Sequence, residues 1–182
     1  LHYLSETQHH KLEHISNIQR LIEDDFVWMD RFTIRNLELY QGNTPGAVTL
    51  LDIIDSTISP MGGRMLKRWL ALPLKNADKI KQRHEVVNFL TKEKITLQKI
   101  QNHIKHIGDL ERLISKVATG KVNPREVIQL KNSLEAIVPI KAISSACNNQ
   151  SLKIIGDTLQ SCDVLREKIK ETLNEEAPVN VL

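Results

Sequence analysis

The chain has 182 residues, of which 41% are hydrophobic and 26% charged, the balance of an ordinary folded protein rather than of a disordered or membrane-embedded one. Only 4% are aromatic, which disfavours a strand-rich sandwich and a surface that stacks the bases of single-stranded nucleic acid. A formal net charge of +3 permits contact with a polyanion but falls short of the basic excess typical of a nucleic-acid-binding domain.

The opening segment predicts one amphipathic helix. Its apolar side chains recur at helical spacing and form a single stripe, made of Leu1, Leu4, Leu12, Ile15, Ile18 and Ile22. Three acidic residues close the segment, and residues 26–29 have the β-type composition of a short strand. We expect residues 37–40 to pair back with that run. Asp30 is a typical N-cap and predicts a single helical turn through Asn36.

The rest of the chain is predicted to be a succession of helices. Each begins after a residue whose side chain accepts hydrogen bonds from the first turn, namely Thr49, Ser59, Asn76, Thr91, Asp109 and Asn123. Pro60 and Pro124 stand at the first helical position, where the missing N–H has no cost. Pro73 and Gly120 mark helix ends. Two shorter helices are expected near residues 152–159 and 164–173.

Two of these helices carry more specific expectations. Pro139 lies inside the helix that follows Asn123, so we expect a kink or a break near Ala136. The helix after Asn76 is expected to turn four side chains inward, namely Ile80, His84, Val87 and Leu90. The total of seven to nine helices with one marginal β element predicts an all-α multi-helix bundle.

Two fragments of enzyme motifs occur, and both favour structural interpretations. His10 and His14 match the H-x-x-E-H pattern of inverted zinc peptidases, but they lie at the edge of the apolar stripe with no third ligand nearby. Residues 119–122 resemble the end of a phosphate-binding loop, yet Ser115 and Val122 replace its first glycine and its hydroxyl residue. We therefore assign no catalytic, cofactor-binding or metal-binding residue.

The two cysteines and the apolar runs indicate in which cellular compartment the protein is expected. Cys147 and Cys162 have no CxxC partner and no histidine at zinc-finger spacing, so free thiols are expected. The apolar runs are short, and the beginning of the chain has no basic region followed by an apolar one. We expect a cytoplasmic protein that makes no contact with a membrane.

The densest basic stretch is a candidate for contact with DNA phosphates through Arg64, Lys67 and Arg68. Leu66 and Trp69 interleave with these charges at helical spacing. This pattern favours a core-facing Leu/Trp stripe with a solvated basic face, and leaves the phosphate contacts as the alternative.

Two short motifs are interpreted as structural. After Ser59 and Pro60, the poor helix formers Gly62 and Gly63 indicate that another backbone packs closely against the first turn. In residues 108–113, Asp109 stands at a helix start, and the charges of this residue and of Arg112 are expected to point outward.

Three stretches, in this order and spacing, resemble the core or lever domain of the MutS mismatch-recognition family. They are residues 29–39 (MDRFTIRNLEL), 57–70 (TISPMGGRMLKRWL) and 107–113 (IGDLERL). The resemblance covers nearly the whole chain and implies a multi-helix bundle of that type with at most a minor β element. It further implies that residues 1–24 form a helix linking a connector domain to the core. Residues 25–182 would then be the first half of the core, ending near the insertion of the DNA clamp.

For function, the resemblance implies a longer parent protein with a mismatch-reading domain and a connector before this segment, and a clamp and an ABC-type ATPase after it. ATP, Mg²⁺ and mismatched double-stranded DNA would be bound by that parent, a DNA-dependent ATPase, whose partners would be a second MutS copy and a MutL-type protein. This chain has no counterpart of the mismatch wedge or of the Walker A loop, so it is expected not to be an enzyme.

Stiff helices between an ATPase and a clamp can convert nucleotide state into clamp position by rigid-body movement, and this lever role is our leading hypothesis. Two alternatives remain open. The chain could be a sequence-independent DNA-binding module that uses the basic face between residues 64 and 83. It could also be a purely structural scaffold that supports a dimer.

Overall fold

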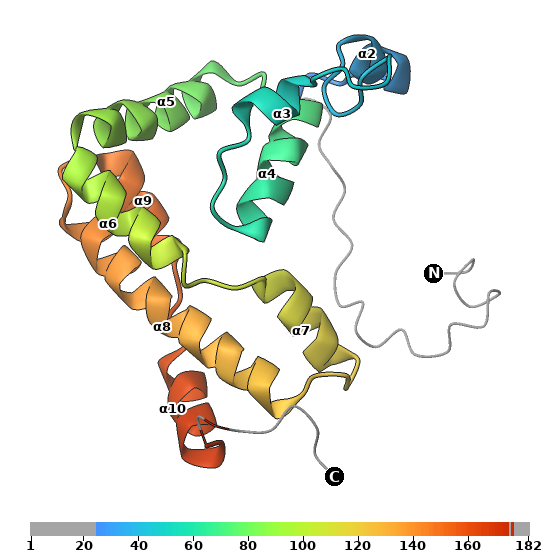
Figure 1. The fold of residues 1–182 in the computed structure, drawn as a ribbon. Helices are drawn as coiled ribbons and strands as arrows, with labels where there is room; N and C mark the ends of the chain where they lie inside the picture. The colour runs from blue at the N-terminus through green and yellow to red at the C-terminus, as the bar shows by residue number, and fades with distance from the viewer. Residues whose placement is uncertain (1–24, 175, 177–182) are drawn as a thin grey trace.

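The computed structural model describes residues 25–174 and residue 176, and this part of the chain is helical without a sheet. Figure 1 shows its nine helices, whose labels are kept here. They are α2 Arg31–Asn36, α3 Leu50–Ile54, α4 Pro60–Ala71, α5 Ala77–Lys92, α6 Lys94–Ile104, α7 Leu110–Ala118, α8 Pro124–Ala146, α9 Gln150–Thr158 and α10 Asp163–Thr172. The all-α prediction is confirmed, whereas the helix predicted over residues 1–24 lies outside the described residues.

The longest helix, α8, is the element around which most of the others pack. The α6, α9 and α10 helices lie against it, α7 packs beside its first half, and α5 contacts α6 and α9 (Figure 1). The α2, α3 and α4 helices take no part in these main packing contacts of the described chain. In the ribbon, α4 lies inside the arc formed by the other helices, with one end toward α5 and the other toward α7. No helix in this part is both long and apolar enough to cross a membrane.

The core is divided into two apolar clusters that share α8. In one, Ile140 of α8 is buried with Ile100 of α6 and Leu152 of α9. In the other, Leu130 and Leu134 of α8 are buried with Leu113 of α7. Burial of such aliphatic side chains is the main stabilising contribution in a folded domain. The α6, α7, α8 and α9 helices are therefore held together by apolar contact.

The predicted helix starts are confirmed at most positions by hydrogen bonds to the first turn. Side-chain oxygens of Asp30, Thr49, Ser59, Asn76, Asp109 and Asn123 accept bonds from backbone N–H groups two or three residues ahead. Gly120 has the positive φ of 66° that suits a glycine just past a helix end.

The start predicted at Thr91 is wrong. The Thr91 hydroxyl donates to the backbone carbonyl of Val87 at 2.6 Å, inside α5, and this helix continues through Lys92. Glu93 takes the N-cap position of α6 without a side-chain bond.

The exposed face of α5 also differs from the prediction. His84 and Val87 are exposed, while Val86 and Phe89 pack on the α6–α8–α9 cluster.

Two other local expectations are overturned by tertiary contacts. The break predicted near Ala136 is absent, because α8 runs through Pro139, while the alternative of a kink stays a prediction. Ile137 and Ile140 pack on different apolar clusters, so both halves of the helix are held in place despite the hydrogen bond that proline cannot donate. Residues 37–40 do not pair with residues 26–29. Instead, Phe26 forms an isolated antiparallel bridge with Leu74.

The close approach of α9 to α8 generates a first prediction. A Cβ at Gly156 would lie 2.7 Å from the Cβ of Ser144, which is 2% exposed. Gly156→Ala is therefore expected to lower the free energy of unfolding by about 1–3 kcal/mol, measured by urea denaturation. Helix propensity alone would act in the opposite direction, by up to about 1 kcal/mol.

Gly63→Ala in α4 is the matched control, because the nearest atom to its added Cβ is the side-chain oxygen of Thr57, at 3.3 Å. This variant is expected to be neutral or slightly stabilising. An increase in stability for Gly156→Ala, equal to that of the control, would contradict the close packing of α8 and α9.

Candidate functional site

The first turn of α4 sets the position of the candidate site. The Ser59 hydroxyl accepts a hydrogen bond from the N–H of Gly62 at 3.1 Å, with Pro60 at the first helical position. A Cβ at Gly62 or Gly63 would find side-chain atoms of Ser59 and Thr57 as its nearest neighbours. Side chains of the preceding loop, rather than another backbone as predicted, therefore pack against these glycines.

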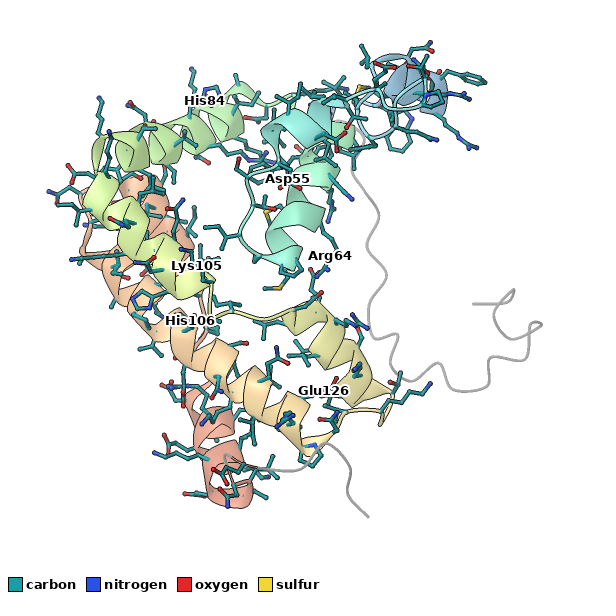
Figure 2. The ribbon with its side chains drawn as sticks, in the orientation of Figure 1. Asp55, Arg64, His84, Lys105, His106 and Glu126 are labelled. Atoms are coloured by element: carbon teal, nitrogen blue, oxygen red, sulfur yellow. The ribbon has the colours of Figure 1, made fainter. Side chains whose placement is uncertain are left out.

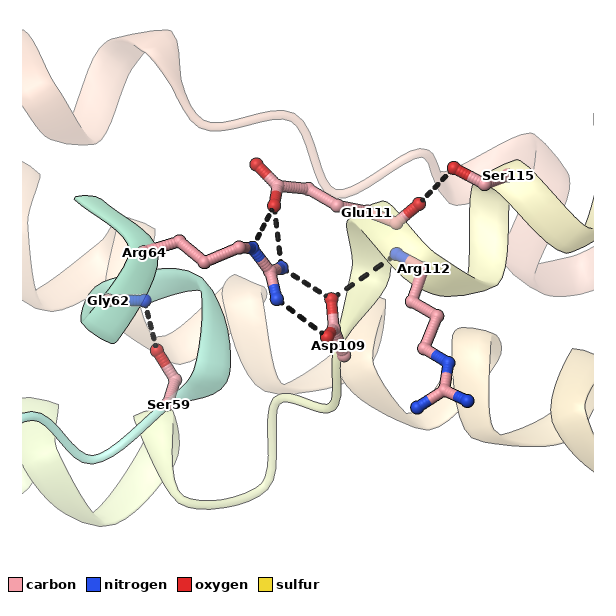
Figure 3. A network of polar contacts seen from close by, with 7 residues as sticks. All are labelled: Ser59, Gly62, Arg64, Asp109, Glu111, Arg112 and Ser115. Atoms are coloured by element: carbon pink, nitrogen blue, oxygen red, sulfur yellow. Dashed lines mark hydrogen bonds and ion pairs between the residues drawn. The ribbon is translucent and has the colours of Figure 1, made fainter. Parts of the chain in front are cut away.

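One turn into α4, Arg64 extends toward the beginning of α7 (Figure 2). Its guanidinium donates two hydrogen bonds to the carboxylate of Asp109, from Nη2 to Oδ1 at 2.6 Å and from Nη1 to Oδ2 at 2.9 Å. Its Nε donates to Oε2 of Glu111 at 2.8 Å. Figure 3 shows the guanidinium between the two carboxylates. We call Arg64, Asp109 and Glu111 the polar junction.

The α7 helix strengthens this junction. Asp109 is its N-cap and accepts a hydrogen bond from the N–H of Arg112 at 3.2 Å (Figure 3). The bidentate bond from Arg64 is the first cause that lowers the pKa of Asp109, and the bond from the Arg112 N–H lowers it further. In turn Asp109, and then Glu111, raise the pKa of Arg64. Asp109 and Arg64 are therefore both charged at neutral pH.

The junction is open to solvent. The side chain of Arg64 is 47% exposed and that of Glu111 is 68% exposed, while Asp109 is 22% exposed. Exposed ion pairs are weakened by salt and hold two elements together less firmly than an apolar core. The polar contact between α4 and α7 is thus weaker than the apolar contact between α7 and α8.

The opposite side of α7 is fixed to α8. Lys116 pairs with Glu126, which also closes the capping box at the start of α8 by accepting from the N–H of Asn123 at 3.2 Å. This lysine is the main cause of the lowered pKa of Glu126. A hollow of about 300 Å³ lies beside the pair, lined by Arg112 and Gln129 among others. With the Leu113 cluster, these contacts make α7 and α8 one packed unit.

The predicted phosphate-contact residues divide into two groups. Arg64 is already held by two carboxylates, so a phosphate would have to compete with them. Lys67 and Arg68 are exposed on α4. Nothing in the structure tests contact with DNA, so the phosphate role of these three residues stays a prediction.

Trp69 and the carboxylates of α7 are placed differently from the predictions. Trp69 is 42% exposed rather than core-facing, and the guanidinium carbon of Arg83 lies 3.6 Å from the centre of its ring. Asp109 binds Arg64 instead of pointing freely outward. Sequence reasoning missed this pairing because 45 residues separate the partners. The signal available was that both residues lie in stretches that carry the family resemblance.

The histidine pair and the two cysteines are the remaining residues that the sequence singles out. His10 and His14 lie outside the described residues. Within the part that the structure describes, no three or more His, Cys, Asp or Glu side chains gather in a way that could hold a metal ion. Cys147 and Cys162 are free thiols, as predicted.

The charge of Asp109 generates a second prediction, tested by Asp109→Asn. Asparagine can still cap α7, so the change removes the ion pair but keeps the cap. Since the pKa of Asp109 is lowered by folding, its ionised form stabilises the protein above the unfolded-state pKa of about 3.9. This contribution is lost as the pH falls through the lower folded-state pKa.

The wild-type chain is therefore expected to unfold at a higher urea midpoint than Asp109→Asn at pH 7 in low salt, and the difference is expected to vanish in strong acid. Chemical denaturation followed by circular dichroism across pH measures it. A difference that stays constant at all pH values would mean that the ion pair does not stabilise the fold.

Comparison with known proteins identifies the family. The chain matches the family model described as MutS domain III over residues 32–181. It is 66% identical to the DNA mismatch repair protein MutS of Flavobacterium psychrophilum over 181 residues, which are 100% of this chain and 21% of that protein. The MutS of Christiangramia forsetii is 64% identical over 98% of this chain and 21% of its own length.

A more distant relative, the MutS of Parabacteroides distasonis, is 46% identical over 98% of this chain and 20% of its own length. The chain thus spans about a fifth of the length of the curated relatives it matches. Since the family match covers most of its residues and the similarity extends along its whole length, this chain belongs to the MutS family of DNA mismatch-repair proteins and corresponds to domain III.

Proposed function

We propose that this chain is the lever segment of a MutS-type protein, in which it transmits the nucleotide state of an ATPase to the position of a DNA clamp. In this proposal ATP, Mg²⁺ and mismatched double-stranded DNA are bound by the complete protein. Its partners are a second MutS copy and a MutL-type protein. In this proposal the 182 residues of this chain link the ATPase to the clamp, and no catalytic step is assigned to them.

The polar junction is the observation that carries the proposal. None of the twelve residues of α4 is fully buried, and the side chain of Arg64 makes the ion pairs that join this helix to α7. An interface made of exposed ion pairs can exchange partners or separate at low cost, whereas an interdigitated core has to move as one piece. This contrast between neighbouring helices supports rigid-body movement of α4 relative to α7 and α8.

The long α8 helix is suited to pass such a movement on. Its 23 residues extend over about 35 Å at the standard rise per residue. At one end it is fixed to α7 by the Leu113–Leu130–Leu134 cluster, and farther along it packs on α6 and α9. A displacement of α7 by the junction would therefore reach residues far from Arg64.

A second candidate function rests on the exposure of Lys67 and Arg68. Two exposed cations on one helix can contact DNA phosphates without reading the bases. Such contacts would weaken steeply with salt. The lever role and the DNA-contact role predict different effects of mutation. Substitutions at neighbouring residues of α4 can therefore distinguish the two roles.

The third prediction uses Arg64→Gln, with Arg68→Gln as the matched control, in the complete protein. The quantities measured are the affinity for mismatched DNA with and without ATP, and the affinity for ATP with and without DNA. Arg64→Gln is expected to reduce the coupling by about fivefold or more in both directions, because thermodynamic coupling is reciprocal. The control is expected to retain it.

DNA affinity in the absence of ATP should be unchanged in Arg64→Gln. Full coupling in this variant would contradict the lever role. A loss of affinity and a shallower salt dependence in Arg68→Gln or Lys67→Gln would instead support the direct contact with DNA.

A further inference from the structure

A fully buried serine lies where α8 passes the beginning of α7. Ser133 is 0% exposed, in a core whose other buried side chains are mostly aliphatic. Its Oγ accepts a hydrogen bond from the N–H of Gly108 at 3.0 Å and donates one to the carbonyl of Gln129 at 2.8 Å. A buried polar group without a partner destabilises a fold, so these two bonds hold the hydroxyl in one orientation.

Gly108 lies directly against α8 at this point. A Cβ on this residue would be 3.0 Å from Nε2 of Gln129 and 3.4 Å from Oγ of Ser133. Because glycine has no Cβ, its backbone N–H can come within hydrogen-bonding distance of the serine. The Gly108 carbonyl also accepts from the N–H of Leu110, the first residue of α7, at 3.0 Å. Gly108 therefore connects the start of α7 to a buried side chain of α8.

The next residue along the chain, Asp109, is the centre of the polar junction. Its carboxylate accepts two hydrogen bonds from Arg64 and one from the N–H of Arg112. Consecutive Cα atoms are about 3.8 Å apart, so a shift of Gly108 moves the backbone of Asp109 with it. The Ser133 hydroxyl is bonded to the backbone on either side of it rather than to this carboxylate. Its influence on the junction therefore passes through the backbone.

The paired bonds from Arg64 make the junction sensitive to such a shift. Two parallel bonds form only when the guanidinium and the carboxylate face each other in one geometry. The apolar contact of Leu113 with Leu130 and Leu134 keeps α7 on α8, but apolar contact has no preferred direction. A hydrogen bond does have one. The bond from Gly108 to Ser133 supplies this direction at the residue next to Asp109.

We propose that Ser133 is a positioning residue for the polar junction, because its bond to Gly108 holds Asp109 where both bonds from Arg64 can form. The same serine joins the junction to the middle of α8, so that a change at Asp109 reaches this helix directly. This second step rests on the proposed lever role, whereas the positioning of Asp109 does not.

The pKa of Asp109 reports on the geometry of the junction, because the bond from Arg64 is the first cause that lowers it. Carbon-13 NMR of the side-chain carboxyl measures this pKa in the 182-residue chain, with Asp109→Asn to assign the resonance. Ser133→Ala is expected to raise the pKa toward its ordinary value. The charges of Glu111 and Arg112 are the same in both chains. In the background of Arg64→Gln, Ser133→Ala is expected to cause no further rise.

Ser144→Ala is the matched control. Ser144 lies farther along the same helix, is 2% exposed and faces Gly156 of α9, so a general loosening of α8 would follow from this change as well. It is expected to leave the pKa of Asp109 unchanged. Ser133→Cys places a weaker acceptor of similar size at the same position and is expected to raise the pKa less than Ser133→Ala. Far-UV circular dichroism verifies the helices, and the cysteine variant provides the test if the alanine variant unfolds.

An unchanged pKa of Asp109 in folded Ser133→Ala would overturn the proposal. An equal rise in Ser144→Ala, or in the background of Arg64→Gln, would overturn it too, since the effect would then not depend on the junction. The coupling between ATP and mismatched DNA in the complete protein distinguishes this inference from the lever role. A raised pKa with coupling reduced as in Arg64→Gln supports both. A raised pKa with full coupling supports the positioning of Asp109 and contradicts the lever role.

Discussion

The bidentate contact of Arg64 with Asp109, extended to Glu111, is the interaction on which the placement of α4 depends. No side chain of this helix is fully buried, so apolar burial contributes less to its placement than it does for α7 on α8. A planar guanidinium can satisfy two carboxylates at once, which lysine in the same position could not do with the same geometry. Three charged groups thereby join α4 to the beginning of α7.

The other side of α7 follows a different principle. Leu113 is buried against Leu130 and Leu134, and the capping box of α8 brings Glu126 within reach of Lys116. A domain III segment thus contains one interface that is packed like a protein interior and another made of solvated ion pairs. In the proposed lever role, movement would be concentrated at the weaker interface, and the packed unit would carry it onward. The proposed lever role rests on this asymmetry.

The sequence predicts those parts of the structure that depend on neighbours three or four residues away. The caps at Ser59, Asp109 and Asn123 and the glycine ending at Gly120 follow from such local hydrogen bonds. The continuity of α8 through Pro139 does not, because it depends on apolar clusters built from several helices.

The candidate site was predictable only in its parts. Arg64 and Asp109 lie in separate motifs, and no periodicity within either motif could show that they meet across 45 residues. Trp69 has the spacing of a core residue, yet it is 42% exposed near the end of α4, and Arg83 from α5 lies over its ring. In each case the outcome is decided by where a distant helix lies.

The most direct test of the account is a distance measurement across the polar junction in the complete protein. Spin labels at Lys67→Cys on α4 and Ile114→Cys on α7, with Cys147, Cys162 and any other native cysteine replaced, report this distance by pulsed electron resonance. A second pair at Ile114→Cys and Glu135→Cys reports the packed α7–α8 unit. We expect ATP to change the first distance distribution and to leave the second unchanged. An identical first distribution with and without ATP would contradict the lever account.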